Sequence, residues 1–129
     1  MTGIKYLLDT STWIEYFLGT PSGEKVQQVL NSGDPCYTCG PVISEVASTL
    51  LRNGLECRPP IEFVKSKCVF LEGNIDDFAN AGIRHAVLKK EEHRISYTDA
   101  LLVVFSETRN LKIVSKDVHL KKHNTLFLH

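Results

Sequence analysis

Short apolar runs alternate along the chain with longer segments in which apolar residues recur every three or four positions. The first run, Tyr6–Leu8, is apolar throughout rather than alternately apolar and polar. That pattern is typical of a strand buried on both faces of a parallel sheet. Four later short runs are also expected to be strands: Cys36–Thr38, Cys68–Leu71, Lys112–Ser115 and Leu126–Leu128.

The segments between these strands carry the apolar stripe of amphipathic helices. Thr12-Trp13-Ile14-Glu15 has capping-box spacing, which predicts that the first helix begins there, and Ser22 is the expected N-cap of the second. The second helix should end near Gly33. Further helices are expected over Gly40–Asn53, Ile61–Lys65, Asp76–Lys90, Ser96–Asn110 and Val118–Lys122.

The elements follow one another in the order β-α-α-β-α-α-β-α-α-β-α-β. Strands that alternate with helices predict an α/β fold, here a three-layer α/β/α arrangement around a mostly parallel five-stranded sheet. No repeat or change in composition divides the 129 residues, so a single domain over residues 1–129 is expected. In the helix over 76–90, the side chains expected to face the core are Phe78, Ala79, Ile83, Ala86 and Val87.

Composition narrows the class of protein. Hydrophobic residues make up 43% and charged residues 23%, and the 15 basic and 15 acidic residues give a formal net charge of +0. This balance argues against a protein that coats nucleic acid through bulk charge. The N-terminus has no signal-peptide pattern, and the longest apolar run, Ala100–Phe105, is far shorter than the ~20 residues that span a bilayer. A cytoplasmic protein without membrane contact is expected.

Cys36 and Cys39 form a C-x-x-C pair, which raises a zinc or redox interpretation. A four-cysteine zinc site needs a second close pair, however, and Cys57 and Cys68 are eleven residues apart. In a strand, Cys36 and Cys39 would point to opposite faces. We therefore expect buried structural thiols, with a disulfide possible only in an oxidising compartment or a hyperthermophile.

Four carboxylates are notable for their positions. Asp9 and Asp117 lie just past the ends of expected strands, whereas Glu45 and Asp99 are expected in the first turns of helices. Each has a simpler explanation as a helix cap or as a partner of the helix dipole, and Ser96-x-x-Asp99 has capping-box spacing. The carboxyl ends of parallel strands nevertheless meet at one edge of a sheet, so the four can converge there.

Four anions around one point repel each other, and a hard divalent cation relieves that repulsion. Mg²⁺ takes oxygen ligands, keeps several waters and binds phosphate oxygens, and such an ion activates water for attack on a phosphodiester. Neither a His-Glu-x-x-His zinc motif nor a P-loop is present in the sequence. The acidic set therefore predicts metal-assisted phosphodiester hydrolysis.

These residues resemble the PIN-domain ribonucleases over residues 4–128. The resemblance rests on Leu7-Leu8-Asp9-Thr10-Ser11, on the helix of Glu45, on Tyr97-Thr98-Asp99-Ala100-Leu101-Leu102 and on Ile113-Val114-Ser115-Lys116-Asp117. It implies a PIN-like fold and cleavage of single-stranded RNA with Mg²⁺ or Mn²⁺. It also implies that Asp9, Glu45 and Asp99 are metal ligands, with Asp117 at a fourth acidic position and Ser11 and Ser115 at supporting polar positions.

A bare domain of this length is most similar to the toxins of virulence-associated, VapC-like toxin–antitoxin modules. That resemblance implies an antitoxin partner and a homodimer. Arg94, Lys116 and Lys121 are candidate contacts to RNA phosphates, the alternative being an ordinary solvated helix face. The aromatic residues Trp13, Tyr16 and Phe17 would serve either core packing or a partner groove.

Other interpretations remain. One is a nuclease of the same fold that processes RNA or acts on DNA. A haloacid-dehalogenase or receiver domain also combines Asp and Mg²⁺, but Asp9-Thr10-Ser11 lacks the second aspartate of the former, and Glu72 is a poor phosphoacceptor for the latter. The last is a catalytically silent binding module, in which all four carboxylates are caps or solvated charges.

Overall fold

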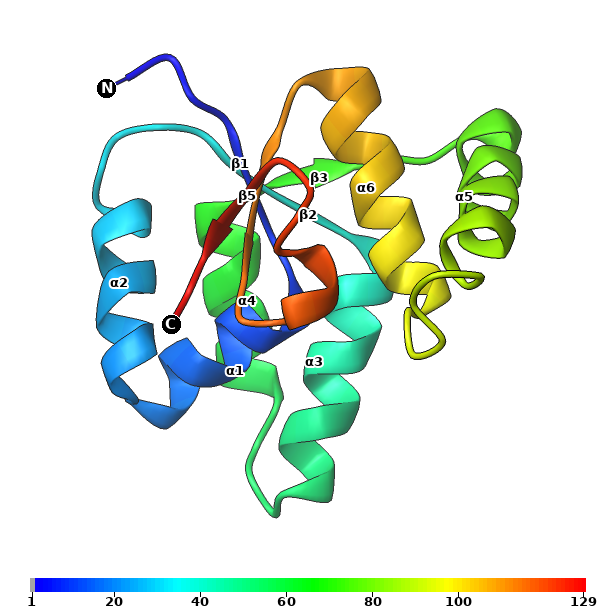
Figure 1. The fold of residues 1–129 in the computed structure, drawn as a ribbon. Coiled ribbons are helices and arrows are strands. Elements are labelled where there is room, and N and C mark those ends of the chain that lie inside the picture. The colour runs from blue at the N-terminus through cyan, green and yellow to red at the C-terminus, as the bar shows by residue number, and fades with distance from the viewer. Residues whose placement is uncertain (1) are drawn as a thin grey trace.

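The computed structural model describes residues 2–129, which fold around a five-stranded parallel sheet (Figure 1). The strands lie in the order β3-β2-β1-β4-β5, so β1 is central. Register is set by pairs such as Leu7 with Tyr37 on β2 and Leu7 with Ile113 on β4. The strands are β1 (Tyr6–Leu8), β2 (Cys36–Cys39), β3 (Val69–Leu71), β4 (Lys112–Ser115) and β5 (Thr125–Phe127).

Helices cover both faces of the sheet, which confirms the predicted three-layer α/β/α class. Parallel crossovers are almost always right-handed. Helices between β1 and β3 are therefore expected on one face of the sheet, and the helices of the return from β3 to β4 on the other. The contacts of α1 with α2 and α3, and of α5 with α6, agree with this division. The helices are α1 (Thr10–Leu18), α2 (Pro21–Leu30), α3 (Gly40–Arg52), α4 (Arg58–Lys67), α5 (Ile75–Leu88) and α6 (Tyr97–Arg109), followed by the short 3₁₀ helix η1 (Val118–Leu120).

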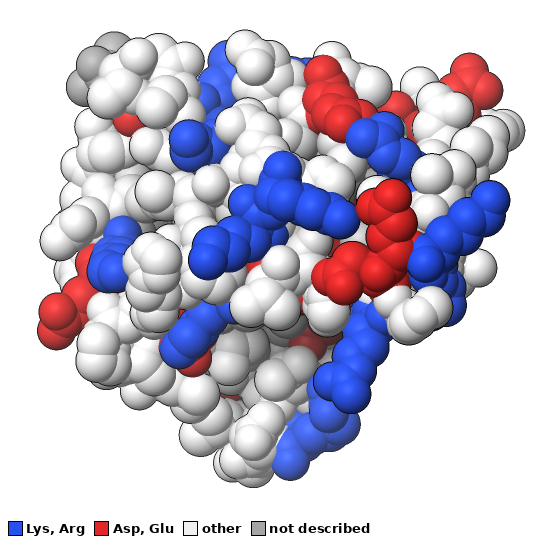
Figure 2. Space-filling model, in the orientation of Figure 1, with Lys and Arg blue, Asp and Glu red and all other residues white. Residues whose placement is uncertain are grey.

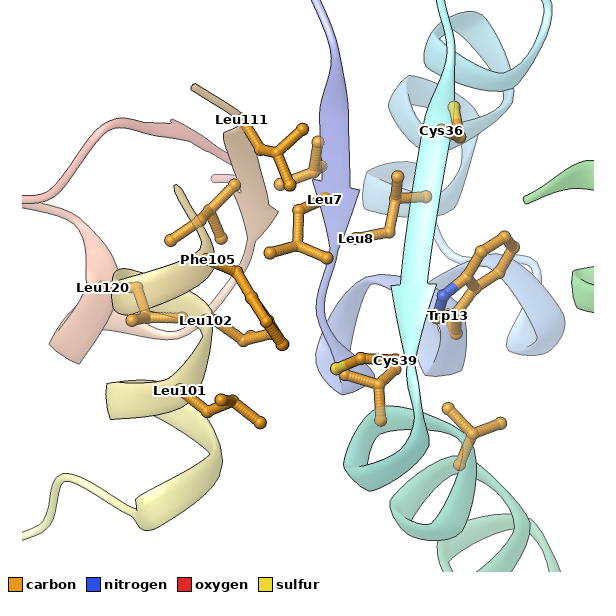
Figure 3. Close-up of a cluster of buried hydrophobic side chains, with 14 of the residues drawn as sticks. Leu7, Leu8, Trp13, Cys36, Cys39, Leu101, Leu102, Phe105, Leu111 and Leu120 are labelled. Carbon is orange, nitrogen blue, oxygen red and sulfur yellow. The ribbon is translucent and has the colours of Figure 1, made fainter. Parts of the chain in front are cut away.

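The core lies on both sides of β1, as its unbroken apolar run predicted. Leu7 and Leu8 are both fully buried. Figure 3 shows Leu7 on the side of Leu102 and Phe105 of α6, while Leu8 and Trp13 lie on the other side of the strand. The central strand β1 is therefore packed between two apolar layers. This packing sets the position of Asp9, the residue that directly follows the strand.

The aromatic residues of α1 serve core packing rather than an open groove. Trp13 is fully buried, and its ring stacks on that of Phe17 with centroids 5.9 Å apart. Tyr16 is partly buried and stacks on Phe63 of α4 at 5.3 Å. These contacts attach α1 to the sheet and to α4, and so stabilise the start of α1 beside the end of β1.

Two predicted helix starts were wrong. The first helix begins at Thr10 rather than Thr12, because the Asp9 carboxylate accepts a hydrogen bond from the Thr12 backbone N–H and so acts as the N-cap. The second begins at Pro21 with Thr20 as its N-cap, because the Thr20 hydroxyl accepts from the Gly23 N–H. Ser22 instead donates to the carbonyl of His129. In both places several neighbouring residues have side chains that can cap a helix, and the sequence does not show which of them does so.

The predicted inward face of α5 was also wrong. Phe78, Ile83 and Val87 are 50%, 65% and 56% exposed, and the small residues Ala79 and Ala86 are exposed with them. The residues buried against α6 are instead Asp77, Ala81, His85 and Leu88.

Two polar residues take the buried face of α5 because each finds a partner. Asp77 accepts hydrogen bonds from Arg109, with Nη2 at 2.9 Å from Oδ2, and a ring nitrogen of His85 lies 3.1 Å from the carbonyl oxygen of Ile95. A buried polar group with a partner avoids the cost of desolvation. Hydrophobic spacing alone could not reveal these partners.

Several boundaries differ in smaller ways. The fourth helix begins at Arg58 rather than Ile61, because Pro59 and Pro60 fall in its first turn, where no backbone N–H is needed. The segment after Asp117 is a 3₁₀ turn rather than a helix over 118–122, and the last strand ends at Phe127.

All four cysteines are free thiols, with Cys36 and Cys39 buried and Cys57 and Cys68 partly buried. Burial raises the pKa of Cys36 and Cys39 to about 11 and that of Cys68 to about 12, which keeps these thiols protonated and unreactive. Within residues 2–129, no helix combines the length and the apolar character needed to cross a bilayer.

Candidate functional site

The sheet topology creates a crevice at the carboxyl ends of β1 and β4. The crossover from β1 leads to β2 on one side, whereas β4 lies on the other side and is reached from β3. Such a point of divergence is where open α/β sheets bind ligands. A cavity of about 670 Å³ lies here, and its walls include all four predicted acidic residues: Asp9, Glu45, Asp99 and Asp117. Asp9, which follows β1, and Asp117, which precedes η1, are thus brought to the same cavity although they are 108 positions apart.

Asp9 is the most buried of the four, with 5% of its surface exposed. Its Oδ1 accepts hydrogen bonds from the Thr12 N–H at 3.0 Å and the Ser11 hydroxyl at 2.7 Å, and its Oδ2 accepts from the Ser115 hydroxyl at 2.5 Å. Burial raises the pKa of Asp9, and these hydrogen bonds only partly offset that effect. Asp9 is therefore both a helix cap and a buried carboxyl that a bound cation would favour in its charged form.

Asp99 combines the same two roles. It completes the predicted capping box, because its N–H donates to the Ser96 hydroxyl and its Oδ2 accepts from the Ser96 N–H, both at 3.1 Å. Among residues 2–129, no donor contacts Oδ1. Burial, with repulsion from Asp117 and Asp9, raises the pKa of Asp99 to about 6. Asp99 therefore does cap its helix, as the simpler explanation predicted. Within the described chain, capping nevertheless leaves its Oδ1 without a donor and the carboxylate charge without a counter-charge at the cavity.

Glu45 reaches the cavity from α3 and is held at both carboxylate oxygens. The Thr10 hydroxyl donates to Oε1 at 2.6 Å, and the Thr98 hydroxyl donates to Oε2 at 3.0 Å. We did not identify either threonine as functional from the sequence, although Thr10 follows Asp9 and Thr98 precedes Asp99. Their position beside two acidic candidates was the available signal.

Asp117 is more open than Asp9 and Asp99, with a side chain 30% exposed. Its Oδ1 accepts a hydrogen bond from the His119 N–H at 2.9 Å, which makes Asp117 the cap of η1. The His119 ring lies with Nδ1 2.5 Å from Oε2 of Glu92, and this contact raises the pKa of His119. When the His119 imidazole is protonated, it places a positive charge about 4.0 Å from Oδ1 of Asp117 and so reduces the negative charge at this end of the cavity.

The two predicted supporting serines are found beside Asp9. Ser11 accepts a hydrogen bond from the Lys116 N–H at 3.1 Å, and Ser115 accepts one from the Asp117 N–H at 2.8 Å; both hydroxyls then donate to Asp9. Ser11 lies in the cavity wall, whereas Ser115 is fully buried behind Asp9. The backbone after β4 is thereby connected to the carboxyl that follows β1.

The three predicted cations differ in position. Arg94 and Lys116 line the cavity, but the Lys116 ammonium pairs with Glu15 at 2.6 Å. Lys121 lies outside the cavity wall, with its ammonium 5.0 Å from the ring centroid of Phe127. In Figure 2, basic and acidic side chains are interspersed over the face shown rather than forming one basic surface. Within the described chain, Arg94 forms no ion pair, so its guanidinium is available to an anion at the cavity.

The donor set suits a hard divalent cation. It consists of carboxylate and hydroxyl oxygens, the ligand type that Mg²⁺ prefers, and burial leaves Asp9 and Asp99 in need of a counter-charge. Over residues 2–129, no three carboxylate, imidazole or thiol groups already stand together in a ready-made metal cluster. The cavity is therefore an open acidic pocket in which side chains and water would share the coordination.

The raised pKa of Asp99 predicts an unusual dependence of stability on pH. Between the ordinary value near 3.8 and about 6, the native state binds a proton that the unfolded chain does not. Unfolding free energy should therefore rise as pH falls from 7.5 to 5.5, by about 1 kcal/mol from this group. The raised pKa values of Asp9 and His119 act with the same sign, whereas burial lowers the pKa of His123, which acts with the opposite sign. Urea unfolding in EDTA measures this effect.

Asp99→Asn is the matched variant for that measurement, because it removes the titrating group and keeps an oxygen that can accept the capping hydrogen bond. The variant should show a shallower slope of stability against pH than the parent protein. Because the comparison cancels the contributions of the other titrating groups, a variant with the same slope as the parent protein would contradict this assignment.

Comparison with known proteins agrees with this architecture. A family model described as "PIN domain" matches residues 6–126. A search of curated proteins found no match.

Three solved structures illustrate the likeness. VapBC2 from Rickettsia felis, bound to a DNA fragment from its promoter, has a TM-score of 0.73 at 13% identity, over 96% of this chain and 97% of that one. A toxin–antitoxin complex from Klebsiella pneumoniae has a TM-score of 0.68 at 16% sequence identity, over 96% of this chain and 98% of that one. VapC20 from Mycobacterium tuberculosis, described as a sarcin–ricin loop cleaving toxin, has a TM-score of 0.65 at 14% sequence identity, over 86% of this chain and 87% of that one.

At such identities these likenesses concern the fold, which is the same three-layer arrangement. The family model covers nearly the whole chain, including Asp9, Glu45, Asp99 and Asp117. This protein therefore belongs to the PIN domain family.

Proposed function

We propose that this protein is a Mg²⁺- or Mn²⁺-dependent endoribonuclease that hydrolyses phosphodiester bonds of single-stranded RNA. The observation that carries the proposal is the single cavity lined by Asp9, Glu45, Asp99 and Asp117. These carboxylates would hold the ion, which when bound supplies a polarised phosphoryl group and a more acidic water. Membership of the PIN family, whose members are generally nucleases, supports the same chemistry.

The residues of this chain have distinct roles in the proposal. Asp9 and Asp99 contribute buried charge at fixed positions, because each is held by the cap of its own helix. Asp117 is more exposed and would contact the ion or a water beside it. Arg94 would contact an RNA phosphate next to the acidic pocket, since Lys116 is already paired with Glu15.

We further propose that the protein acts as the toxin of a toxin–antitoxin pair. The likeness to VapBC2 and to the Klebsiella pneumoniae complex supports this part of the proposal. Association of two copies is also proposed, and the exposed apolar residues of α5, among them Phe78 and Ile83, support an additional contact surface. Light scattering on the purified protein would test for the dimer.

The test of the nuclease is cleavage of a labelled single-stranded RNA with and without Mg²⁺ or Mn²⁺. A hairpin with a single-stranded loop is a second substrate, because VapC20 is described as cleaving the sarcin–ricin loop. Glu45→Gln keeps the size of the side chain and removes its charge. We expect it to lower the cleavage rate by about 100-fold or more, comparable to losing one electrostatic contact in an active site.

Glu62→Gln is the matched control, because Glu62 is exposed on α4 and lies outside the cavity. It should cleave at the parental rate. An RNA-processing nuclease of the same fold would cleave but would show no inhibition by a cognate antitoxin. A silent binding module would neither cleave RNA nor gain thermal stability from Mn²⁺, and that result would overturn the proposal.

A further inference from the structure

The side chain of Glu45 differs from the other acids of the cavity in how it is held. Asp9, Asp99 and Asp117 each accept a backbone N–H of their own helix start. Glu45 accepts no backbone hydrogen bond within the described chain and forms no ion pair there. Its polar contacts are the hydroxyls of Thr10 at 2.6 Å and Thr98 at 3.0 Å.

We propose that Thr10 and Thr98 are positioning residues, whose hydroxyls hold the Glu45 carboxylate in place for the divalent ion. This inference rests on the proposed function above. A glutamate has three rotatable side-chain bonds, so its carboxylate can take several positions unless other groups hold it. Without a donor on each oxygen, the partly exposed Glu45 side chain would turn away from the cavity towards solvent.

The two threonines are themselves fixed by the fold. Thr10 is the first residue of α1, directly after the capping residue Asp9, and Thr98 lies in the first turn of α6, directly before Asp99. The two hydrogen bonds therefore connect the first turns of α1 and α6 to Glu45 on α3, and each threonine is the chain neighbour of another acidic residue of the cavity. We call this the Thr10–Glu45–Thr98 bridge.

The bridge is compatible with metal binding. The Thr10 hydroxyl donates to Oε1 of Glu45 and the Thr98 hydroxyl donates to Oε2, so each carboxylate oxygen accepts one hydrogen bond. Each carboxylate oxygen has two lone pairs, and one hydroxyl uses only one of them. A lone pair thus remains on each Glu45 oxygen for a cation, while the hydroxyls set the orientation of the group. Such outer contacts typically change metal affinity by about 10- to 100-fold.

The experiment measures Mn²⁺ affinity by calorimetry, without RNA. The variants are Thr10→Val, Thr98→Val and the double variant, which keep the side-chain shape and remove the hydroxyl. We expect each single change to weaken Mn²⁺ binding several-fold, and the double change to weaken it by about 10- to 100-fold. The conservative variants Thr10→Ser and Thr98→Ser keep the hydroxyl and should bind within about twofold of the parent.

Thr49→Val is the matched control. Thr49 lies in the same cavity wall, one helical turn after Glu45, but its hydroxyl accepts a hydrogen bond from Arg52 and does not contact Glu45. This variant should bind Mn²⁺ like the parent protein. Urea unfolding in EDTA separates a loss of affinity from a loss of fold; if the double variant does not fold, the two single variants and their serine counterparts decide the question.

The outcomes distinguish this inference from the proposed function. If the parent protein binds Mn²⁺ and the folded double variant binds it equally well, the bridge does not position Glu45 and the inference is wrong. Equal weakening by valine and serine would also overturn it, because the hydroxyl would then be irrelevant. If the parent protein binds no Mn²⁺, the proposed function fails first, and the inference fails with it.

Discussion

Asp99→Asn is expected to slow RNA cleavage strongly while making the metal-free protein more stable. The charged Asp99 is buried beside Asp9 and Asp117, and its pKa of about 6 shows that the fold disfavours its ionised form. At pH 7.5 a neutral amide should raise the unfolding free energy by about 1 to 3 kcal/mol, since one pKa unit corresponds to about 1.4 kcal/mol. Cleavage should fall by about 100-fold or more, because the ion loses a charged ligand.

The two effects have one cause and are measured on one variant. Urea unfolding in EDTA gives the stability, and single-turnover cleavage of a labelled RNA with Mg²⁺ gives the activity. Asp76→Asn is a suitable comparison, because Asp76 is exposed near the start of α5 and lies outside the cavity. A less stable Asp99→Asn protein, or one that cleaves at the parental rate, would show that Asp99 is only a cap.

Trp13→Ala is expected to produce the largest loss of stability. Trp13 is fully buried on α1, next to the capping residue Asp9, and packs against the rings of Phe17 and Tyr16. Removing a buried tryptophan costs about 3 to 5 kcal/mol, because the apolar contacts are lost and a cavity remains. This is a large share of the 5 to 15 kcal/mol that holds a typical domain folded.

Leu18→Ala is the matched control on the same helix, since Leu18 is 53% exposed. It should change the unfolding free energy by less than about 0.5 kcal/mol. Trp13 is the only tryptophan of the chain, so unfolding is best followed by circular dichroism rather than fluorescence. If Trp13→Ala and Leu18→Ala were equally stable, α1 would not depend on this packing for its position.

The parallel sheet could be predicted because its signals are local. A strand such as Tyr6–Leu8 is apolar on both faces, and this property is visible without knowing its neighbours. The buried face of α5 could not be predicted in the same way. It depends on Arg109, 32 residues away from Asp77, and on the carbonyl of Ile95 beside His85.

For the acidic residues too, the sequence showed the candidates, and the tertiary contacts showed how they are used. The sequence allowed either capping or chemistry at Asp9, Asp99 and Asp117, and in the structure each caps a helix while lining a shared cavity. Helix starts at the carboxyl edge of a parallel sheet present backbone N–H groups there, so a residue that caps the helix also faces the crevice. The two explanations therefore did not exclude each other.

By itself, the sequence determined the α/β class, the approximate place of each strand and the set of acidic candidates, because these follow from hydrophobic spacing and from residue chemistry along the chain. Only the tertiary structure decided which oxygens face one another. It brought the hydroxyls of Thr10 and Thr98 to Glu45 and paired Lys116 with Glu15. Among residues 2–129, it left Arg94 without an ion pair at the cavity wall. Such contacts depend on how β1, α3 and α6 pack around one edge of the sheet, and no local pattern encodes them.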